Sequence, residues 1–400
     1  MEFNQLLQVA LGISSPWFIE AVHLDEQTNN LEIKIDFTAG AKFACPNCNT
    51  ECSVHDTKER RWQHLNFLQY CCYITARVPR VNCSKCGKVI QIEAPFARSG
   101  SGFSLLLECM MLQLAKIMPV NEVAKLFNIS DDRVWRVIHH YVPKAVEQTD
   151  WSMVKTIGID ETSRKKGHNY VTTVTDLDTS KVIYVTVGKD ATTIDNFRAE
   201  FEKRGLLPNQ IQSICSDLSP AFILGIRNNF PNAQHVYDKF HIIKIVNKAV
   251  DEVRTKEAKT NEQIRNCKYS LLKNPENLTS KQKTVLDSIL AEYTQSGEAY
   301  KFKLEFQDLF KLPSKAEAEL YLTDWITSVQ NSKISQMKKL AKSIKRHWNG
   351  ILSWFDSKIS NGKVEALNCG IQNLKRRAKG FRTLENFQAL IYLVMGKLSF

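Results

Sequence analysis

The sequence predicts a multidomain α/β protein. Three observations support this. Two Cys-x-x-Cys pairs lie in the first part of the chain, a helix-rich stretch with a short turn follows them, and strand-like and helical segments alternate beyond Trp151. A chain of 400 residues is also longer than most single domains. We expect five parts, at residues 1–98, 99–150, 151–260, 261–343 and 344–400.

The first part is predicted to be a zinc ribbon. Seven of the eleven cysteines lie between residues 45 and 86, and the N-terminus has no secretory signal pattern, so metal binding is favoured over disulfides. Residues 70–78 are rich in strand formers, as a ribbon hairpin requires. Cys52 and His55 offer an alternative ligand set, which we rank lower. Four thiolates suit a structural Zn²⁺ ion, and the predicted ligands are Cys45, Cys48, Cys83 and Cys86.

The second part is predicted to be a helix-turn-helix. Residues 103–118 are apolar on most faces, which predicts a buried helix, and residues 120–127 predict a shorter one. Ser130 follows as a favourable N-cap for a third helix over residues 131–142. An ordinary helical hairpin is the alternative. In a helix-turn-helix the last helix enters a DNA groove, and the side chains expected to face DNA are Arg133, Arg136, His139 and His140.

Beyond Trp151 the pattern predicts a ribonuclease H-like catalytic domain with a mixed sheet. In that fold the first and fourth strands are neighbours, so Asp160 and Asp217, at their ends, should meet. Residues 261–343 are predicted to be a helical insertion into this domain. The expected order is strands at 156–161, 170–177 and 182–187, a helix at 192–204, a strand at 211–217, a helix at 220–229 and a strand at 233–238.

The acids of this domain indicate a divalent metal site. Adjacent carboxylates repel each other unless a cation lies between them, and hard oxygen ligands suit Mg²⁺ or Mn²⁺. A two-metal phosphodiester site needs a third carboxylate. Glu365 is the candidate, with Glu161 the next choice.

Asp238 and His241 are predicted to act as a pair beside these acids. The Asp-x-x-His spacing lies where the fifth strand ends and a helix begins. His241 would orient the scissile phosphate or move a proton. The alternative is that Asp238 only caps the helix.

The charge distribution indicates a polyanionic partner. The formal net charge is +12, and residues 331–400 alone hold 14 Lys/Arg against 3 Asp/Glu. Basic side chains neutralise DNA phosphates, although a solvated basic face is the alternative. The predicted DNA contacts in this stretch are Lys375, Arg376, Arg377 and Lys379.

At these residues the chain resembles a bacterial DDE-type insertion-sequence transposase of the ISL3 family. The resemblance implies that Asp160, Asp217 and Glu365 form the metal-binding triad. Ala366 departs from the expected glycine, which puts no catalytic role in doubt. The matching stretches are Gly158-Ile159-Asp160-Glu161, Arg164-Lys165-Lys166-Gly167-His168, Ser216-Asp217-Leu218-Ser219-Pro220, Pro231-Asn232-Ala233, Asp238-Lys239-Phe240-His241, Ser360-Asn361-Gly362, Glu365, Asn368 and Lys375-Arg376-Arg377-Ala378-Lys379-Gly380-Phe381.

The expected function is DNA transposition. The zinc ribbon and the helix-turn-helix would bind the terminal inverted repeats of an insertion sequence. The catalytic domain would cut and join DNA strands, with target DNA as a second partner. We expect at least a homodimer on DNA, no membrane association, and a cytoplasmic, nucleoid-associated location. Two alternatives stay open: a DNA-binding regulator with an inactive catalytic domain, and a structure-specific nuclease without joining activity.

Overall fold

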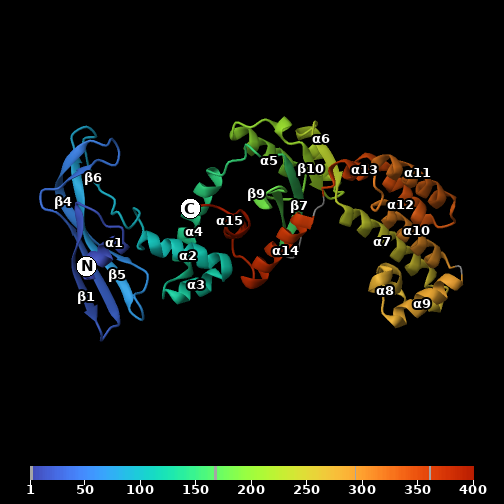
Figure 1. The fold of residues 1–400 in the computed structure, drawn as a ribbon, viewed down its shortest axis with the longest axis horizontal. Coiled ribbons are helices and arrows are strands. Elements are labelled where there is room, and N and C mark those ends of the chain that lie inside the picture. The colour runs from blue at the N-terminus through green and yellow to red at the C-terminus, as the bar shows by residue number, and fades with distance from the viewer. Residues whose placement is uncertain (1–2, 166–168, 293, 360–361) are drawn as a thin grey trace. The chain divides into compact units, whose positions relative to one another are not determined.

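The computed structural model describes residues 3–165, 169–292, 294–359 and 362–400 (Figure 1). The chain divides into two compact units, Met1–Tyr141 with Phe400, and Val142–Ser399. The division lies inside helix α4 (Asp131–Glu147), before the boundary that the sequence suggests after residue 150. Among the described helices, none is long and apolar enough to cross a membrane.

The first unit is built on a six-stranded sheet. Its order is β1-β2-β5-β4-β3, and β6 pairs with β5. Neighbours β1–β2 and β4–β5 are antiparallel, whereas β2 and β5 are parallel. The elements are α1 (Phe3–Ala10), β1 (Trp17–Asp25), β2 (Asn30–Phe37), β3 (Lys42–Ala44), β4 (Glu51–Gln63), β5 (Cys71–Cys83) and β6 (Lys88–Gln91).

This sheet is larger than the predicted ribbon. The strand expected at residues 70–78 is β5, but β1 and β2 lie outside the prediction. In β2, Leu31, Ile33 and Ile35 are buried, while Glu32 and Lys34 between them are more exposed. This two-residue period is typical of a half-buried strand, and it is the sequence signal from which β2 can be predicted.

Three helices follow the sheet, namely α2 (Leu105–Ile117), α3 (Val120–Leu126) and α4. On the inner side of α4, Val134, Val137 and Ile138 are buried. The prediction that α2 is buried on most faces is wrong. Only the side with Leu107, Met111 and Ala115 packs inward, and four apolar side chains elsewhere on α2 are exposed.

Helix α4 continues to Glu147, beyond the predicted end at residue 142. The guanidinium group of Arg204 explains the extension. It donates to the carbonyl oxygens of Val146, Glu147 and Thr149 at 3.0, 3.2 and 3.0 Å. Carbonyls at a helix C-terminus have no partner within the helix, so Arg204 satisfies groups that would otherwise end it earlier.

The second unit contains a five-stranded mixed sheet with the order β11-β10-β7-β8-β9. Strands β7, β8 and β9 are antiparallel neighbours, and β10 is parallel to both β7 and β11. The predicted pairing of the first and fourth strands is therefore confirmed. The strands are β7 (Thr156–Lys165), β8 (Asn169–Asp176), β9 (Lys181–Val187), β10 (Ser213–Ser216) and β11 (Gln234–Tyr237).

Helices α5 (Thr192–Lys203) and α6 (Pro220–Asn229) contact each other and share a core with the sheet. Phe197, Phe201 and Phe222 are fully buried there, beside Ile157 and Ile214 of the strands. On the β9 edge, α15 (Leu384–Met395) contacts the strand, because the Tyr392 hydroxyl accepts a 2.8 Å hydrogen bond from the Val185 backbone N–H.

Helices fill the chain between β11 and α14 (Gly362–Arg377) (Figure 1). They share one hydrophobic core, which includes Phe306 and Trp325. A Cβ on Gly350 of α13 would lie 2.3 Å from the Tyr237 ring of β11, so this close packing requires glycine. The helices are α7 (Lys239–Glu257), α8 (Lys268–Leu272), α9 (Ser280–Ala291), α10 (Gln295–Leu309), α11 (Lys315–Asn331), α12 (Ser335–Arg346) and α13 (Trp348–Ser357), with the 3-10 turns η2 (Glu262–Ile264) and η3 (Pro275–Asn277). A further 3-10 turn, η1 (Pro208–Gln210), precedes β10.

Candidate functional site

Three aspartates lie side by side across neighbouring parallel strands: Asp217 and Asp238 directly follow β10 and β11, whereas Asp160 lies within β7, which continues to Lys165. Ile159 of β7 pairs with Ser216 of β10, and Ser216 pairs with Tyr237 of β11. The next residue along each segment is an acid, and we call Asp160, Asp217 and Asp238 the acidic row. Strand register, rather than loop conformation, therefore brings these residues together.

Asp160 is the most constrained predicted metal ligand. Its side chain is buried, with the residue 8% exposed. Oδ1 accepts a hydrogen bond from the Glu161 backbone N–H at 2.7 Å, and Oδ2 accepts one from Asn368 Nδ2 at 2.6 Å. Burial, together with the charges of Asp217 and Asp238, raises the pKa of Asp160 to about 6.

Helix α14 brings Glu365 to the same region in its first turn. One face of this helix is fastened along β7. Asn368 bonds to Asp160, Gln372 to the Thr162 hydroxyl, and Lys375 Nζ to the Ser163 carbonyl oxygen at 2.7 Å. Residues three or four apart share a helix face, so the face that fastens α14 also carries Glu365. Burial and the charge of Asp238 raise the pKa of Glu365.

Asp238 and His241 form the predicted pair. His241 Nδ1 lies 2.7 Å from Asp238 Oδ2, and Asp238 Oδ1 accepts a 3.2 Å hydrogen bond from the Phe240 backbone N–H. Asp238 therefore caps α7 and holds the imidazole at once. The hydrogen bond to Asp238 raises the pKa of His241 despite partial burial, and the charges of Asp160 and Asp217 add to the effect.

Asn368 and Gln372 are site residues for which the sequence predicts no role. They could have been predicted from their positions three and seven residues after Glu365, because this spacing places all three residues on one face of a helix. The Oδ1 atom of Asn368 is buried and has no hydrogen-bond partner among the described residues. Of the stretches that carry the family resemblance, Lys166, Gly167, His168, Ser360 and Asn361 lie outside the described residues.

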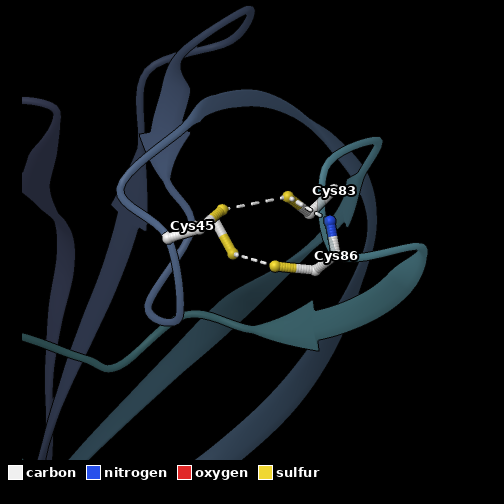
Figure 2. A group of neighbouring side chains, drawn as sticks. Cys45, Cys83 and Cys86 are labelled. Carbon is white, nitrogen blue, oxygen red and sulfur yellow. Dashed lines mark hydrogen bonds between the residues drawn. The ribbon is translucent and has the colours of Figure 1, made fainter.

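The four predicted zinc ligands come together in the first unit, and Figure 2 shows Cys45, Cys83 and Cys86 of this group. The Sγ atoms of Cys45 and Cys86 are 3.9 Å apart and those of Cys48 and Cys83 are 3.4 Å apart. Tetrahedral Zn–S bonds of about 2.3 Å place sulfurs about 3.8 Å apart. Hydrogen bonds from Thr50 lower the pKa of Cys48 to about 6, which favours the thiolate. The geometry is that of a structural zinc site.

The alternative zinc ligand set is not assembled, since Cys52 is buried while His55 is exposed. Within the described residues, the four thiols are also the only group of three or more such ligands whose atoms all lie within 4.8 Å. The carboxylates of the second unit are more widely spaced than the thiols. They are nevertheless close enough to change one another's pKa.

The side chains predicted to face DNA from α4 all line one cleft of about 650 Å³. The cleft lies between α4 and the loop over residues 98–103. The guanidinium carbon of Arg133 lies 4.2 Å from the centre of the Phe103 ring, and the rings of His139 and Trp135 stack with centroids 5.8 Å apart. Buried Glu108 fixes the loop, because it accepts hydrogen bonds from Arg98 and Ser101.

The basic residues predicted to contact DNA on α14 and just after it differ in their surroundings. Lys375 is partly buried and is used within the chain through its bond to Ser163. Arg376 and Lys379 are exposed, although Arg376 also bonds to the Asn373 side chain. Burial lowers the pKa of Arg377.

Comparisons with known proteins match this organisation. Three family models cover the chain: a zinc-finger of transposase IS204/IS1001/IS1096/IS1165 at residues 41–86, a helix-turn-helix domain of transposase family ISL3 at residues 92–142, and a transposase model at residues 157–391. The chain is 27% identical over 398 residues to the transposase for insertion sequence element IS1001 of Bordetella parapertussis, with 96% of each chain covered. It is 26% identical over 431 residues to the transposase for insertion sequence element IS1557 of Mycobacterium tuberculosis strain H37Rv, covering 98% of this chain and 94% of the relative. Because the transposase model alone spans more than half of the sequence, the chain belongs to the ISL3 family of transposases.

Proposed function

We propose that this DNA transposase is a DDE enzyme that binds the terminal inverted repeats of an insertion sequence and catalyses metal-dependent strand cleavage and strand transfer. The observation that carries the proposal is the acidic row across three neighbouring parallel strands, with Glu365 on the helix fastened beside it. The strand order supports a ribonuclease H-like core, and the helices after β11 support a helical insertion at residues 261–343.

A divalent cation fits the acids. Burial and like charge raise the pKa values of Asp160 and Glu365, so a cation would stabilise their ionised forms. The buried Oδ1 of Asn368, which has no hydrogen-bond partner in the described part of the chain, adds another hard oxygen. We assign Asp160, Asp217 and Glu365 as the ligands of Mg²⁺ or Mn²⁺. When bound, the cation supplies Lewis-acid activation of the attacking hydroxyl and of the scissile phosphate.

We assign Asp238 and His241 a supporting role at this site. Asp238 fixes the imidazole through Nδ1, which leaves Nε2 to contact the scissile phosphate or carry a proton. We expect His241→Ala and His241→Gln each to lose one to two orders of magnitude in cleavage rate at nearly constant melting temperature. Full activity in both variants, or a rate loss that only follows unfolding, would return the pair to a capping role.

The DNA contacts are assigned to two elements. Arg133, Arg136, His139 and His140 on α4 would contact the terminal repeat, and their shared cleft supports this. Exposed Arg376 on α14 and exposed Lys379 just after this helix are the stronger candidates for backbone contact, whereas Lys375 acts through its bond to β7. We expect the active form to be at least a dimer, because two element ends must be joined.

The test is cleavage of labelled repeat ends in Mg²⁺. We expect Asp160→Ala, Asp217→Ala and Glu365→Ala each to abolish cleavage, because the ligands act as a unit, while repeat binding is retained. Cleavage by the Glu365→Ala variant at the wild-type rate would move the third ligand to Glu161. Repeat binding without cleavage by the wild-type protein would favour a regulator, and cleavage without joining would favour a nuclease.

A further inference from the structure

A cluster of cations covers one side of α12 in the second unit. Residues 333–346 contain six Lys/Arg and no Asp/Glu. We call this cluster the α12 basic face, and its members are Lys333, Lys338, Lys339, Lys342, Lys345 and Arg346. The opposite side of the helix is fully engaged in the hydrophobic core, since Met337, Leu340 and Ile344 are buried.

None of these six side chains forms an ion pair or a hydrogen bond with any residue that the structure describes. Some other lysines of the helical region are paired. Lys268 lies 3.0 Å from Asp251, and Lys315 lies 2.6 Å from Asp356. The α12 basic face differs from these segments because six cations gather within 14 residues that contain no acid.

Folding does not require this pattern. If the six cations were replaced by neutral polar residues, the apolar side of α12 would be buried equally well. Like charges three or four positions apart on a helix also repel each other. Lys338 and Lys342 are such a pair, as are Lys342 and Arg346. The cluster therefore destabilises the isolated helix, and a polyanionic partner would relieve the repulsion.

We propose that the α12 basic face binds the phosphate backbone of duplex DNA without regard to sequence. The inference rests on the chain being a DNA transposase, but not on the assignment of its metal ligands. Five of the six cations are lysines, which are compact point charges on flexible stems. Such groups neutralise phosphates. They lack the planar guanidinium group of arginine, which can donate two parallel hydrogen bonds to one base. The helix belongs to the same compact unit as Asp160, so the contact would hold DNA that the catalytic unit engages.

The experiment measures the salt dependence of DNA binding by full-length protein without divalent cations, so that cleavage cannot interfere. The test variant combines Lys339→Gln, Lys342→Gln, Lys345→Gln and Arg346→Gln. A matched control combines Lys256→Gln, Lys259→Gln, Lys281→Gln and Lys283→Gln, which removes the same charge from other exposed lysines of the helical region. Each protein is titrated with a labelled repeat-end duplex and with a duplex of shuffled sequence.

Each lost phosphate contact lowers the slope of log K against log salt by about 0.9. We expect the test variant to lose about 2 to 4 units of slope on both duplexes, and the control variant to lose less than about one. A third variant with Lys339→Arg, Lys342→Arg and Lys345→Arg should keep the wild-type slope. An unchanged slope in the test variant, or an equal loss in the control, would overturn the inference. Absence of cleavage by the wild-type protein would instead count against the proposed metal chemistry and leave this result standing.

Discussion

At the scale of single residues, Asp160 is a carboxylate whose surroundings disfavour its charge. Its pKa is raised from 3.8 to about 6, first by burial and then by the neighbouring aspartates. Because the pKa is higher in the folded state, the protonated carboxyl group favours the folded state over the unfolded state. This contribution to stability is fully present below pH 3.8 and is lost as the pH rises through about 6. At neutral pH the ionised group therefore costs on the order of 3 kcal/mol unless a cation is bound.

Asp160→Asn should consequently stabilise the protein at pH 8 in the absence of divalent cations. The neutral amide avoids the cost of ionisation, so we expect a higher melting temperature than that of the wild type. The difference should shrink towards pH 4, where the wild-type side chain is increasingly protonated. Added Mn²⁺ should raise the melting temperature of the wild type and not of the variant. A variant that melts below the wild type at pH 8 would contradict this account of the site.

Asn368 and Gln372 offer a matched comparison on one helix face. Asn368→Ala removes the donor to Asp160, and Gln372→Ala removes a bond to Thr162. We expect Asn368→Ala to weaken Mn²⁺ binding about ten- to hundredfold, whereas Gln372→Ala should cost only about 1 kcal/mol of stability. Titration of zinc-loaded protein with Mn²⁺, followed by electron paramagnetic resonance, measures the difference. Equal affinity in the two variants would show that Asn368 is merely structural.

At the scale of elements, the zinc site depends on two turns. The turn between β3 and β4 carries Cys45 and Cys48, and the turn between β5 and β6 begins at Cys83 and contains Cys86. We expect Cys83→Ser to lose its zinc and to destabilise the first unit, because metal binding is coupled to folding. Cys52→Ser is the control, since Cys52 is a buried thiol outside the ligand set. Zinc content measured by atomic absorption should fall only in the Cys83→Ser protein.

Helix α14 shows how one element can combine several tasks. Its buried residues, including Ile371 and Leu374, fix it in the core. Bonds from Asn368 and Lys375 align it along β7, and this alignment brings Glu365 to the acidic row. Arg376 stays exposed at the end of the same helix. The position of the third acid thus depends on the whole helix rather than on its own turn.

At the scale of the whole molecule, the zinc ligands and the proposed Mg²⁺ or Mn²⁺ ligands lie in different compact units. The four thiols lie in the first unit, and the acidic row lies in the second. We expect calorimetry to resolve two unfolding transitions. Removing zinc should lower only one of them, and Mn²⁺ at about a hundred times its Kd should stabilise only the other, by about 2.7 kcal/mol. A single transition that both metals shift together would show that the units unfold as one.

Local sequence patterns determined much of this molecule. Hydrophobic runs located all five strands of the second unit, and their order predicted that Asp160 and Asp217 would be neighbours. Cysteine spacing located the zinc ligands. These features depend on periodicity and on residues adjacent along the chain or in register, so a sequence displays them directly.

Only the tertiary structure decided which distant groups meet. Asn368 and Asp160 are 208 positions apart, and no local pattern connects them. The extension of α4 depends on Arg204, which lies far beyond its predicted end. The exposed side of α2 and the internal use of Lys375 likewise depend on which surfaces other elements cover. Sequence periodicity predicts that one face of a helix or strand is apolar or basic. Which segment packs against that face depends on tertiary packing between segments that are distant in the sequence.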